Sequence, residues 1–330
     1  MPLYIIITFS AFFISLIGTK LVILTLRNSL KSPDINIMTG KKKAPVPTNG
    51  GIALVFAIII GFLGVQTNYT YILILAIFML TAIPLLSNVM PIHQIAKVAI
   101  RLLAISVALT TFNTSIFIDF DRMPPTLIDK FFAGFFWLWI IYSFDRLEKV
   151  EGLMPLGMIS IGLGLCALTV LSGTFFDDFS IQALIFAAAG VGFLWWNHHP
   201  AKILAGEIAS IPVGFVAGYL LLSAASEGHI IAIFIIAAYF LTDSFVTFFN
   251  RPFSEKFSKQ SIDIPCCALR AIMNSRKPQW IVRVITGINI LLIFIAVQSM
   301  LHDYMAIFNL IIAYIMVFTI IWFFLRKKAR

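Results

Sequence analysis

The stretch Tyr142–Leu153, with the sequence YSFDRLEKVEGL, concentrates side chains of this chain that could do chemistry. It carries Asp145, Glu148 and Glu151 between two long apolar runs, in a chain with only 15 acidic residues among 330. On a helix, these three positions are spaced i, i+3 and i+6, so that successive pairs share a face. Carboxylates gathered in this way can hold a divalent cation, or orient the phosphates of a nucleotide through one. The alternative is a solvated loop in which the neighbouring Arg and Lys neutralise the acids in local pairs.

The rest of the chain is too apolar for a soluble globular protein. Hydrophobic residues make up 60% of the sequence and charged residues 12%, with a mean hydropathy of +0.97. Such a chain places its apolar runs in lipid, and long uninterrupted runs favour helices over a closed barrel. We therefore predict one all-α integral membrane domain over residues 1–330. Nucleic acid is excluded as a partner because the basic residues, despite a net charge of +9, are scattered over many loops.

Eleven apolar runs are predicted to be membrane helices, each of which needs roughly 20 residues to span a bilayer. They are Leu3–Leu26, Gly51–Val65, Tyr71–Leu86, Ala96–Phe112, Phe131–Phe144, Leu153–Leu171, Ile181–Trp196, Ile208–Ala224, Ile230–Phe249, Trp280–Met300 and Met305–Leu325. Lys and Arg gather in alternate loops and in the C-terminal RKKAR, whereas the other loops hold only Arg122 and Lys130. The positive-inside rule then places the N-terminus outside and the C-terminus in the cytosol, with every polar-rich loop on the cytosolic face.

Two of these cytosolic loops contribute lysines and a pair of glycines. In the first loop, Lys42 and Lys43 precede Gly50 and Gly51, and glycines at a helix start permit close approach by a phosphate or by a neighbouring helix. The second loop leads into Lys97. The simpler interpretation is an ordinary positive-inside loop followed by a lysine that extends to the membrane interface.

Two further acids lie at the ends of apolar spans, where charge is costly. Glu207 opens one span and Asp243 lies near the cytosolic end of another. An acid in such a position is a candidate site residue by default. For both, the alternative is a structural hydrogen bond to a neighbouring helix.

Taken in order, the loops resemble the polyprenyl-phosphate N-acetylhexosamine-1-phosphate transferases. This membrane superfamily, glycosyltransferase family 4, includes phospho-N-acetylmuramoyl-pentapeptide translocase and undecaprenyl-phosphate GlcNAc-1-phosphate transferase. The resemblance covers nearly the whole chain. Tyr142–Leu153 matches the family's NxxNxxDGxDGL in frame, and the stretch from His199 to Ser210 matches PPAxxxxGDxGS. Further matches are Asp34, Pro45, Pro47, Gly50 and Gly51 in the first loop, Lys97 after the second, and Asp243.

The resemblance keeps the frame of these motifs and changes several side chains. Glutamate replaces the family's aspartate at positions 148, 151 and 207, which keeps the charge but moves it by about one C–C bond. Ser87-Asn88 stands in place of an acidic pair, and Lys42 stands in place of a histidine. The long loop after Asp243 lacks the family's histidines.

The resemblance implies transfer of a sugar-1-phosphate from a UDP-N-acetylhexosamine to polyprenyl (undecaprenyl) phosphate, for glycan synthesis at a bacterial cytoplasmic (inner) membrane. It implies that Glu207 binds Mg²⁺, that Asp145, Glu148 and Glu151 line the nucleotide-sugar site, and that the lysines contact phosphates. Gly50, Gly51 and Asp243 would complete the substrate site.

Two other functions and the state of assembly stay open at this point. The altered motifs allow a non-catalytic family member that binds polyprenyl lipid or acts as a scaffold for a partner enzyme. A transporter of lipid-linked sugars is disfavoured by the one-sided polar loops, since transporters more often carry ionisable groups at mid-membrane. The expected surroundings are membrane lipid, and a homodimer is left open as the assembly.

Overall fold

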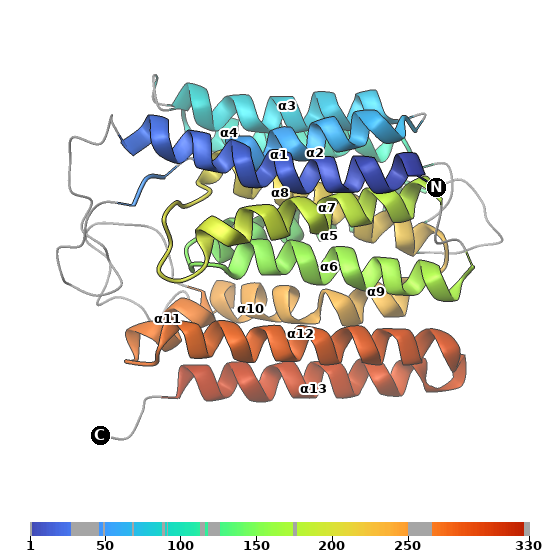
Figure 1. Cartoon of the computed structure of the whole chain (residues 1–330). Coiled ribbons are helices and arrows are strands. Elements are labelled where there is room, and N and C mark those ends of the chain that lie inside the picture. The colour runs from blue at the N-terminus through green and yellow to red at the C-terminus, as the bar shows by residue number, and fades with distance from the viewer. Residues whose placement is uncertain are drawn as a thin grey trace.

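The chain forms a bundle of roughly parallel and antiparallel helices (Figure 1). A computed structural model describes residues 2–27, 46–48, 50–67, 69–87, 90, 92–112, 116–117, 126–173, 177–249 and 266–326. The α-helices in this part of the chain are α1 (Pro2–Arg27), α2 (Ile52–Val65), α3 (Thr70–Ser87), α4 (Gln94–Leu109), α5 (Leu127–Leu147), α6 (Leu153–Leu171), α7 (Asp178–Asn197), α8 (Glu207–Ser226), α9 (Ile230–Ile236), α10 (Ala238–Phe249), α11 (Cys267–Met273), α12 (Pro278–Leu301) and α13 (Ala306–Leu325). A short 3₁₀ helix, η2 (Asp303–Met305), precedes α13.

The apolar runs of the sequence become helices that can cross a membrane. Within the described residues, eight helices are long and apolar enough to do so. The number becomes nine if α9 and α10, which are bent by 64° relative to each other, form one broken span. Each apolar range predicted above coincides with a helix or with this bent pair, with ends that differ by a few residues. The prediction of an all-α, multi-pass membrane protein is therefore confirmed, but the predicted count of eleven spans is not, because α2 has only 14 residues and α4 only 16.

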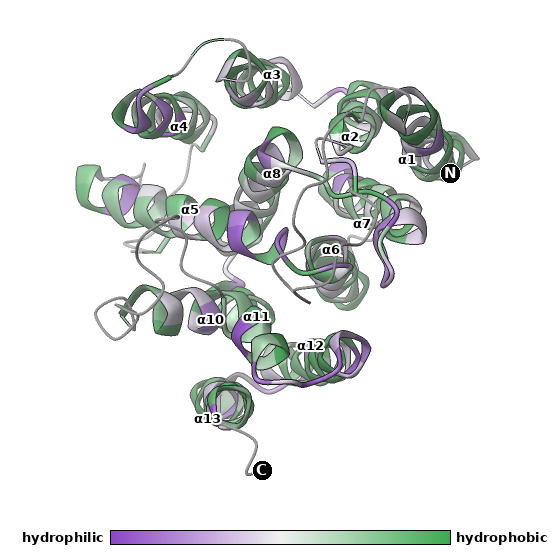
Figure 2. Ribbon diagram, turned by 90° about the vertical axis from the view of Figure 1, so that its left-hand side faces the viewer, coloured by the Kyte–Doolittle hydropathy of each residue, from purple (hydrophilic) through white to green (hydrophobic). Residues whose placement is uncertain are grey.

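Burial differs sharply between the helices, and α8 lies at the centre of the bundle. Figure 2 shows it surrounded by α2, α3, α5, α6 and α7. In the apolar window of α8, 94% of the residues are buried, compared with 17% in α1 and 28% in α13. The outer helices instead expose large apolar side chains such as Phe78, Phe294 and Ile307, as expected of a surface that faces lipid.

Small residues bring α5 and α8 into close contact. A Cβ added at Gly218 would lie 2.3 Å from Cδ1 of Trp137, and one at Gly214 would lie 2.8 Å from Cα of Ile141. In the same contact, the Trp137 indole N–H donates to the carbonyl of Phe215 over 2.8 Å and the two rings stack. Glycines allow two membrane helices to approach this closely. The contact fixes the end of α5, which carries Asp145, relative to the start of α8, which carries Glu207.

Candidate functional site

An ion pair joins two of the predicted site residues at the end of the bundle where α8 begins. Nζ of Lys97, on α4, lies 3.1 Å from Oε2 of Glu207, the first residue of α8. The Lys97 side chain is 13% exposed, whereas that of Glu207 is 51% exposed. Glu207 is therefore accessible from outside the bundle and is also held by a partly buried cation.

Asp145 belongs to the same charged cluster. Its Oδ1 accepts a hydrogen bond of 3.0 Å from the hydroxyl of Ser210, one turn along α8 from Glu207. The positive charges of Arg101 and Lys149 and the negative charge of Glu207 all act on the Asp145 carboxylate. Carboxylates and basic side chains from α4, α5, the turn after α5 and α8 therefore lie close together. Such a group can bind a phosphate ester together with a metal cation.

Glu148 fixes the backbone at the start of α8. It is the C-cap residue of α5, and its Oε1 accepts a 2.8 Å hydrogen bond from the backbone N–H of Gly206. Burial raises the pKa of Glu148, and the bond to the Gly206 N–H opposes that rise. Gly206 itself has φ 74°, a conformation that favours glycine.

The expectation that Asp145, Glu148 and Glu151 lie on one helix is corrected by the structure. Helix α5 ends at Leu147, and Glu151 lies in the turn before α6. The turn forms because Gly152 takes φ 81° as the N-cap residue of α6. Glu151 therefore points toward a different partner from the other two acids.

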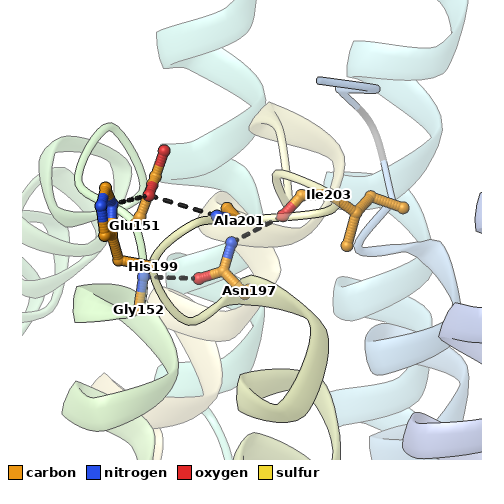
Figure 3. Close-up of polar contacts among 6 residues, drawn as sticks. All are labelled: Glu151, Gly152, Asn197, His199, Ala201 and Ile203. Carbon is orange, nitrogen blue, oxygen red and sulfur yellow. Dashed lines mark hydrogen bonds and ion pairs between the residues drawn. The ribbon is translucent and has the colours of Figure 1, made fainter. Parts of the chain in front are cut away.

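That partner is His199, in the loop between α7 and α8 (Figure 3). The Glu151 carboxylate pairs with Nδ1 of His199 and accepts a 3.2 Å hydrogen bond from the backbone N–H of Ala201. Beside this pair, the side-chain amide of Asn197 connects two backbone segments. Its Oδ1 accepts from the N–H of Gly152 over 2.9 Å and its Nδ2 donates to the carbonyl of Ile203 over 2.8 Å. These bonds tie the loop that leads to Glu207 to the turn that carries Glu151.

Gly50 and Gly51 support the same loop from the other side. Their N–H groups donate to the carbonyls of Leu204 (2.9 Å) and Ala205 (3.1 Å). Of the two possibilities raised by the sequence, the structure shows close approach by a neighbouring segment of protein. Lys42 and Lys43, predicted to contact phosphate, lie outside the described residues.

Adding a side chain at Gly51 is expected to destabilise the protein. A Cβ there would lie 2.2 Å from Cβ of Ala209 and 2.9 Å from the carbonyl oxygen of Ala205, so Gly51→Ala should cost about 1–3 kcal/mol. The matched control is Gly287→Ala within α12, where a Cβ meets nothing within 4 Å and alanine should be neutral or stabilising by up to about 1 kcal/mol. Thermal unfolding in detergent measures both, and equal unfolding temperatures for the two variants would contradict the packing argument.

Asp243, on α10, makes a structural contact with α11. It is 1% exposed, and its Oδ1 accepts a 3.0 Å hydrogen bond from the backbone N–H of Cys267, the first residue of α11. This is the structural hydrogen bond that the sequence offered as an alternative. A contact between Asp243 and substrate remains a prediction.

The charged cluster offers oxygen ligands suited to Mg²⁺. Within the described residues there is no group of three or more His, Cys, Asp and Glu side chains that could hold a metal ion. Mg²⁺, however, usually takes one or two carboxylates and completes its coordination with water and substrate phosphates. Glu207 and Asp145, whose negative charges act on each other, are the two carboxylates that would hold such an ion.

Three polar residues of this region were not singled out as site residues from the sequence. Ser210, Asn197 and His199 each hold a predicted site residue or the loop that carries one. His199 and Ser210 do fall inside the segment that resembles PPAxxxxGDxGS, so the motif itself was a signal for them. For Asn197, which precedes that segment, the sequence carries no comparable signal.

Comparison with known proteins connects this site to one family. Residues 69–225 match the family model of glycosyl transferase family 4, a range that includes Lys97, the three acids of the Tyr142–Leu153 stretch and Glu207. The chain is 28% identical over 264 residues to the phospho-N-acetylmuramoyl-pentapeptide-transferase of a Nitratiruptor species, which covers 68% of this chain and 74% of that protein.

Two other relatives match over shorter stretches. A "probable undecaprenyl-phosphate N-acetylglucosaminyl 1-phosphate transferase" of Bacillus subtilis (strain 168) is 28% identical over 181 residues, 52% of this chain and 49% of that protein. The phospho-N-acetylmuramoyl-pentapeptide-transferase of an Arthrobacter species is 51% identical over 47 residues, 14% of this chain and 13% of that protein. With the motifs in frame and the charged cluster assembled, the chain is similar to glycosyl transferase family 4 over residues 69–225, just under half of its length.

Proposed function

We propose that the protein transfers a sugar-1-phosphate from a UDP-N-acetylhexosamine to a polyprenyl phosphate such as undecaprenyl phosphate. The observation that carries the proposal is the ion pair between Lys97 and Glu207 beside Asp145, at the start of the central helix. The names of two relatives, a phospho-N-acetylmuramoyl-pentapeptide-transferase and a probable undecaprenyl-phosphate N-acetylglucosaminyl 1-phosphate transferase, support the same class of reaction.

In this reaction an oxygen of the lipid phosphate attacks the sugar-bound phosphorus of the nucleotide. A P–O bond forms there, the P–O bond of the pyrophosphate breaks, and UMP leaves with that electron pair. Phosphoryl transfer of this kind depends on positioning and on stabilisation of negative charge. Mg²⁺, held by Glu207 and Asp145, would supply charge neutralisation on the pyrophosphate.

The chain's own residues would divide the remaining work. Glu207 would hold the ammonium group of Lys97 beside the start of α8. There Lys97 would bind an incoming phosphate. Glu148 would keep the first turn of α8 in place through Gly206, and the Glu151–His199 pair would keep the adjoining loop in place. The start of α8 also directs the positive end of a helix dipole toward the phosphates.

The proposed setting is a bacterial cytoplasmic membrane with this end of the bundle facing the cytosol. The start of α1 and the end of α13 lie at opposite ends of the bundle (Figure 1), as required by an N-terminus outside and a C-terminus inside. A cytosolic site would meet a soluble nucleotide sugar and the phosphate of a membrane lipid at one interface. The product would serve the synthesis of a cell-envelope glycan.

The test is release of UMP by the purified protein in nanodiscs. UMP should appear when UDP-N-acetylglucosamine, or UDP-N-acetylmuramoyl-pentapeptide as a second donor, is supplied with undecaprenyl phosphate and Mg²⁺. Omission of the lipid phosphate or chelation of Mg²⁺ should abolish release. A folded protein that releases no UMP from either donor would overturn the proposal and favour a lipid-binding or scaffold role.

A further inference from the structure

A cavity lies at the opposite end of the bundle from the charged cluster. It has a volume of about 670 Å³, within the range of small-molecule sites. Its walls come from the start of α1, the segment between α2 and α3, the ends of α4 and α8, and the start of α7. These elements meet at the end of the bundle marked by the N-terminus in Figure 1. None of the site residues predicted from the sequence lines it.

Acidic side chains line this cavity. Asp177, Asp178 and Glu227 line it, and its lining residues within the described part of the chain include no Lys, Arg or His. Asp177 is the N-cap residue of α7 but makes no capping hydrogen bond with its side chain. Asp178 accepts a long hydrogen bond of 3.4 Å from the hydroxyl of Tyr4.

The position of Glu227 is unfavourable for the fold alone. It is the C-cap residue of α8, where the negative end of the helix dipole repels a carboxylate. Partial burial, and then the negative charge of Asp177, raise the pKa of Glu227. A cation between these carboxylates would remove the repulsion.

Gln182 supplies an independent sign that a ligand belongs in this cavity. The residue lines the cavity, is only 1% exposed, and its Nε2 has no hydrogen-bond partner among the described residues. A buried donor left unpaired costs about 1–3 kcal/mol. An oxygen atom on a bound molecule would satisfy it.

We propose that this cavity binds a molecule that presents a primary ammonium group next to an oxygen acceptor. The ammonium would lie between Glu227 and Asp177, against the faces of the lining aromatic rings such as Tyr219, and the oxygen would accept from Gln182. A bare metal ion fits less well, because a cation cannot accept a hydrogen bond from Nε2 of Gln182. Two sources have this chemistry, the head group of an ethanolamine lipid and a free amino alcohol.

Binding can be measured by native mass spectrometry and thermal unfolding of the full chain in detergent. The probes are short-chain phosphatidylethanolamine, free ethanolamine, and short-chain phosphatidylglycerol as the ligand without an ammonium group. The lipid alone should bind if the source is a head group, and both amines should bind if it is a free amine. Absence of binding by either amine, or equal binding of phosphatidylglycerol, would overturn the proposal.

Two variants locate the binding. Glu227→Gln and Gln182→Leu should each weaken binding of the amine by about tenfold, the loss expected for one charge-assisted or buried hydrogen bond. Leucine at position 182 removes an unpaired donor, so this variant should fold at least as well as the parent. Unchanged affinity in both variants would place the ligand elsewhere.

The matched control is Glu207→Gln, at the other end of α8. It should bind the amine like the parent, whereas Glu227→Gln should release UMP like the parent. The cavity and the proposed transferase site can therefore fail independently of each other.

Discussion

Replacing Glu207 with glutamine is expected to lower the rate of UMP release by about 100-fold or more, the size of effect seen when one charged group is lost from an active site. Glutamine keeps the shape of the side chain and removes the charge that would bind Mg²⁺ and that directs Lys97. Stability should fall only slightly, because the Glu207 side chain is 51% exposed, although the substitution leaves the Lys97 ammonium, whose side chain is 13% exposed, without its partner. Steady-state UMP release and thermal unfolding of the same preparation measure the two effects.

Lys97→Met provides the second half of this experiment. Methionine keeps the apolar stem of the partly buried side chain and removes its charge. If the two residues act as one unit on the phosphates, the double variant should be little worse than either single variant. If the Glu207→Gln protein keeps more than about a third of the parent activity, Glu207 does not stabilise the transition state. A threefold loss of rate corresponds to a change of less than about 1 kcal/mol in the activation free energy.

Replacing Asn197 with leucine is expected to destabilise the protein by about 2–4 kcal/mol, because it leaves two buried backbone groups, the N–H of Gly152 and the carbonyl of Ile203, without partners. Activity should fall as well, since those bonds connect the turn carrying Glu151 to the loop before Glu207. Unfolding in detergent and UMP release would report the two losses.

Asn289 offers a matched control on α12. It is 3% exposed, like Asn197, but neither its Oδ1 nor its Nδ2 has a hydrogen-bond partner among the described residues. Asn289→Leu should therefore be neutral or stabilising. Asn197→Asp separates the two bonds further, because aspartate can still accept from Gly152 but cannot donate to Ile203. If leucine were tolerated equally at both positions, the bridging role of Asn197 would be refuted.

The helices were predictable because each depends on a local property, a long run of apolar residues. Helix α11 was not, because its seven residues carry no such run and it is held by tertiary contacts, including the bond from Cys267 to Asp243. The bend between α9 and α10 could not be predicted from a proline or glycine, because the break falls at Ala237 and neither residue type is nearby. Sequence patterns therefore missed structure that packing alone imposes.

The predicted site divides in the same way. Glu207 was a candidate on local grounds and Lys97 through the family resemblance, but that they form a pair depends on where the bundle places α4, which packs against α3 and α5. The spacing of Glu148 and Glu151 suggested one helical face, whereas Gly152 ends that possibility by adopting a positive φ. The glycine pair was compatible with a phosphate or with a protein neighbour, and only the positions of Leu204 and Ala205 decide between them.

The unequal burial of the helices also sets how fast each can drift in evolution. A side chain of α8 is enclosed by protein and can change only to one of similar shape, whereas lipid accepts Leu, Ile, Val or Phe alike. Three of the least buried helices are α1, α12 and α13, with 17%, 33% and 28% of their apolar windows buried. The family match, which covers residues 69–225, leaves out all three and ends at the last turn of α8. We therefore expect substitutions among relatives to be more frequent on the helices that face the membrane than on those enclosed by other helices.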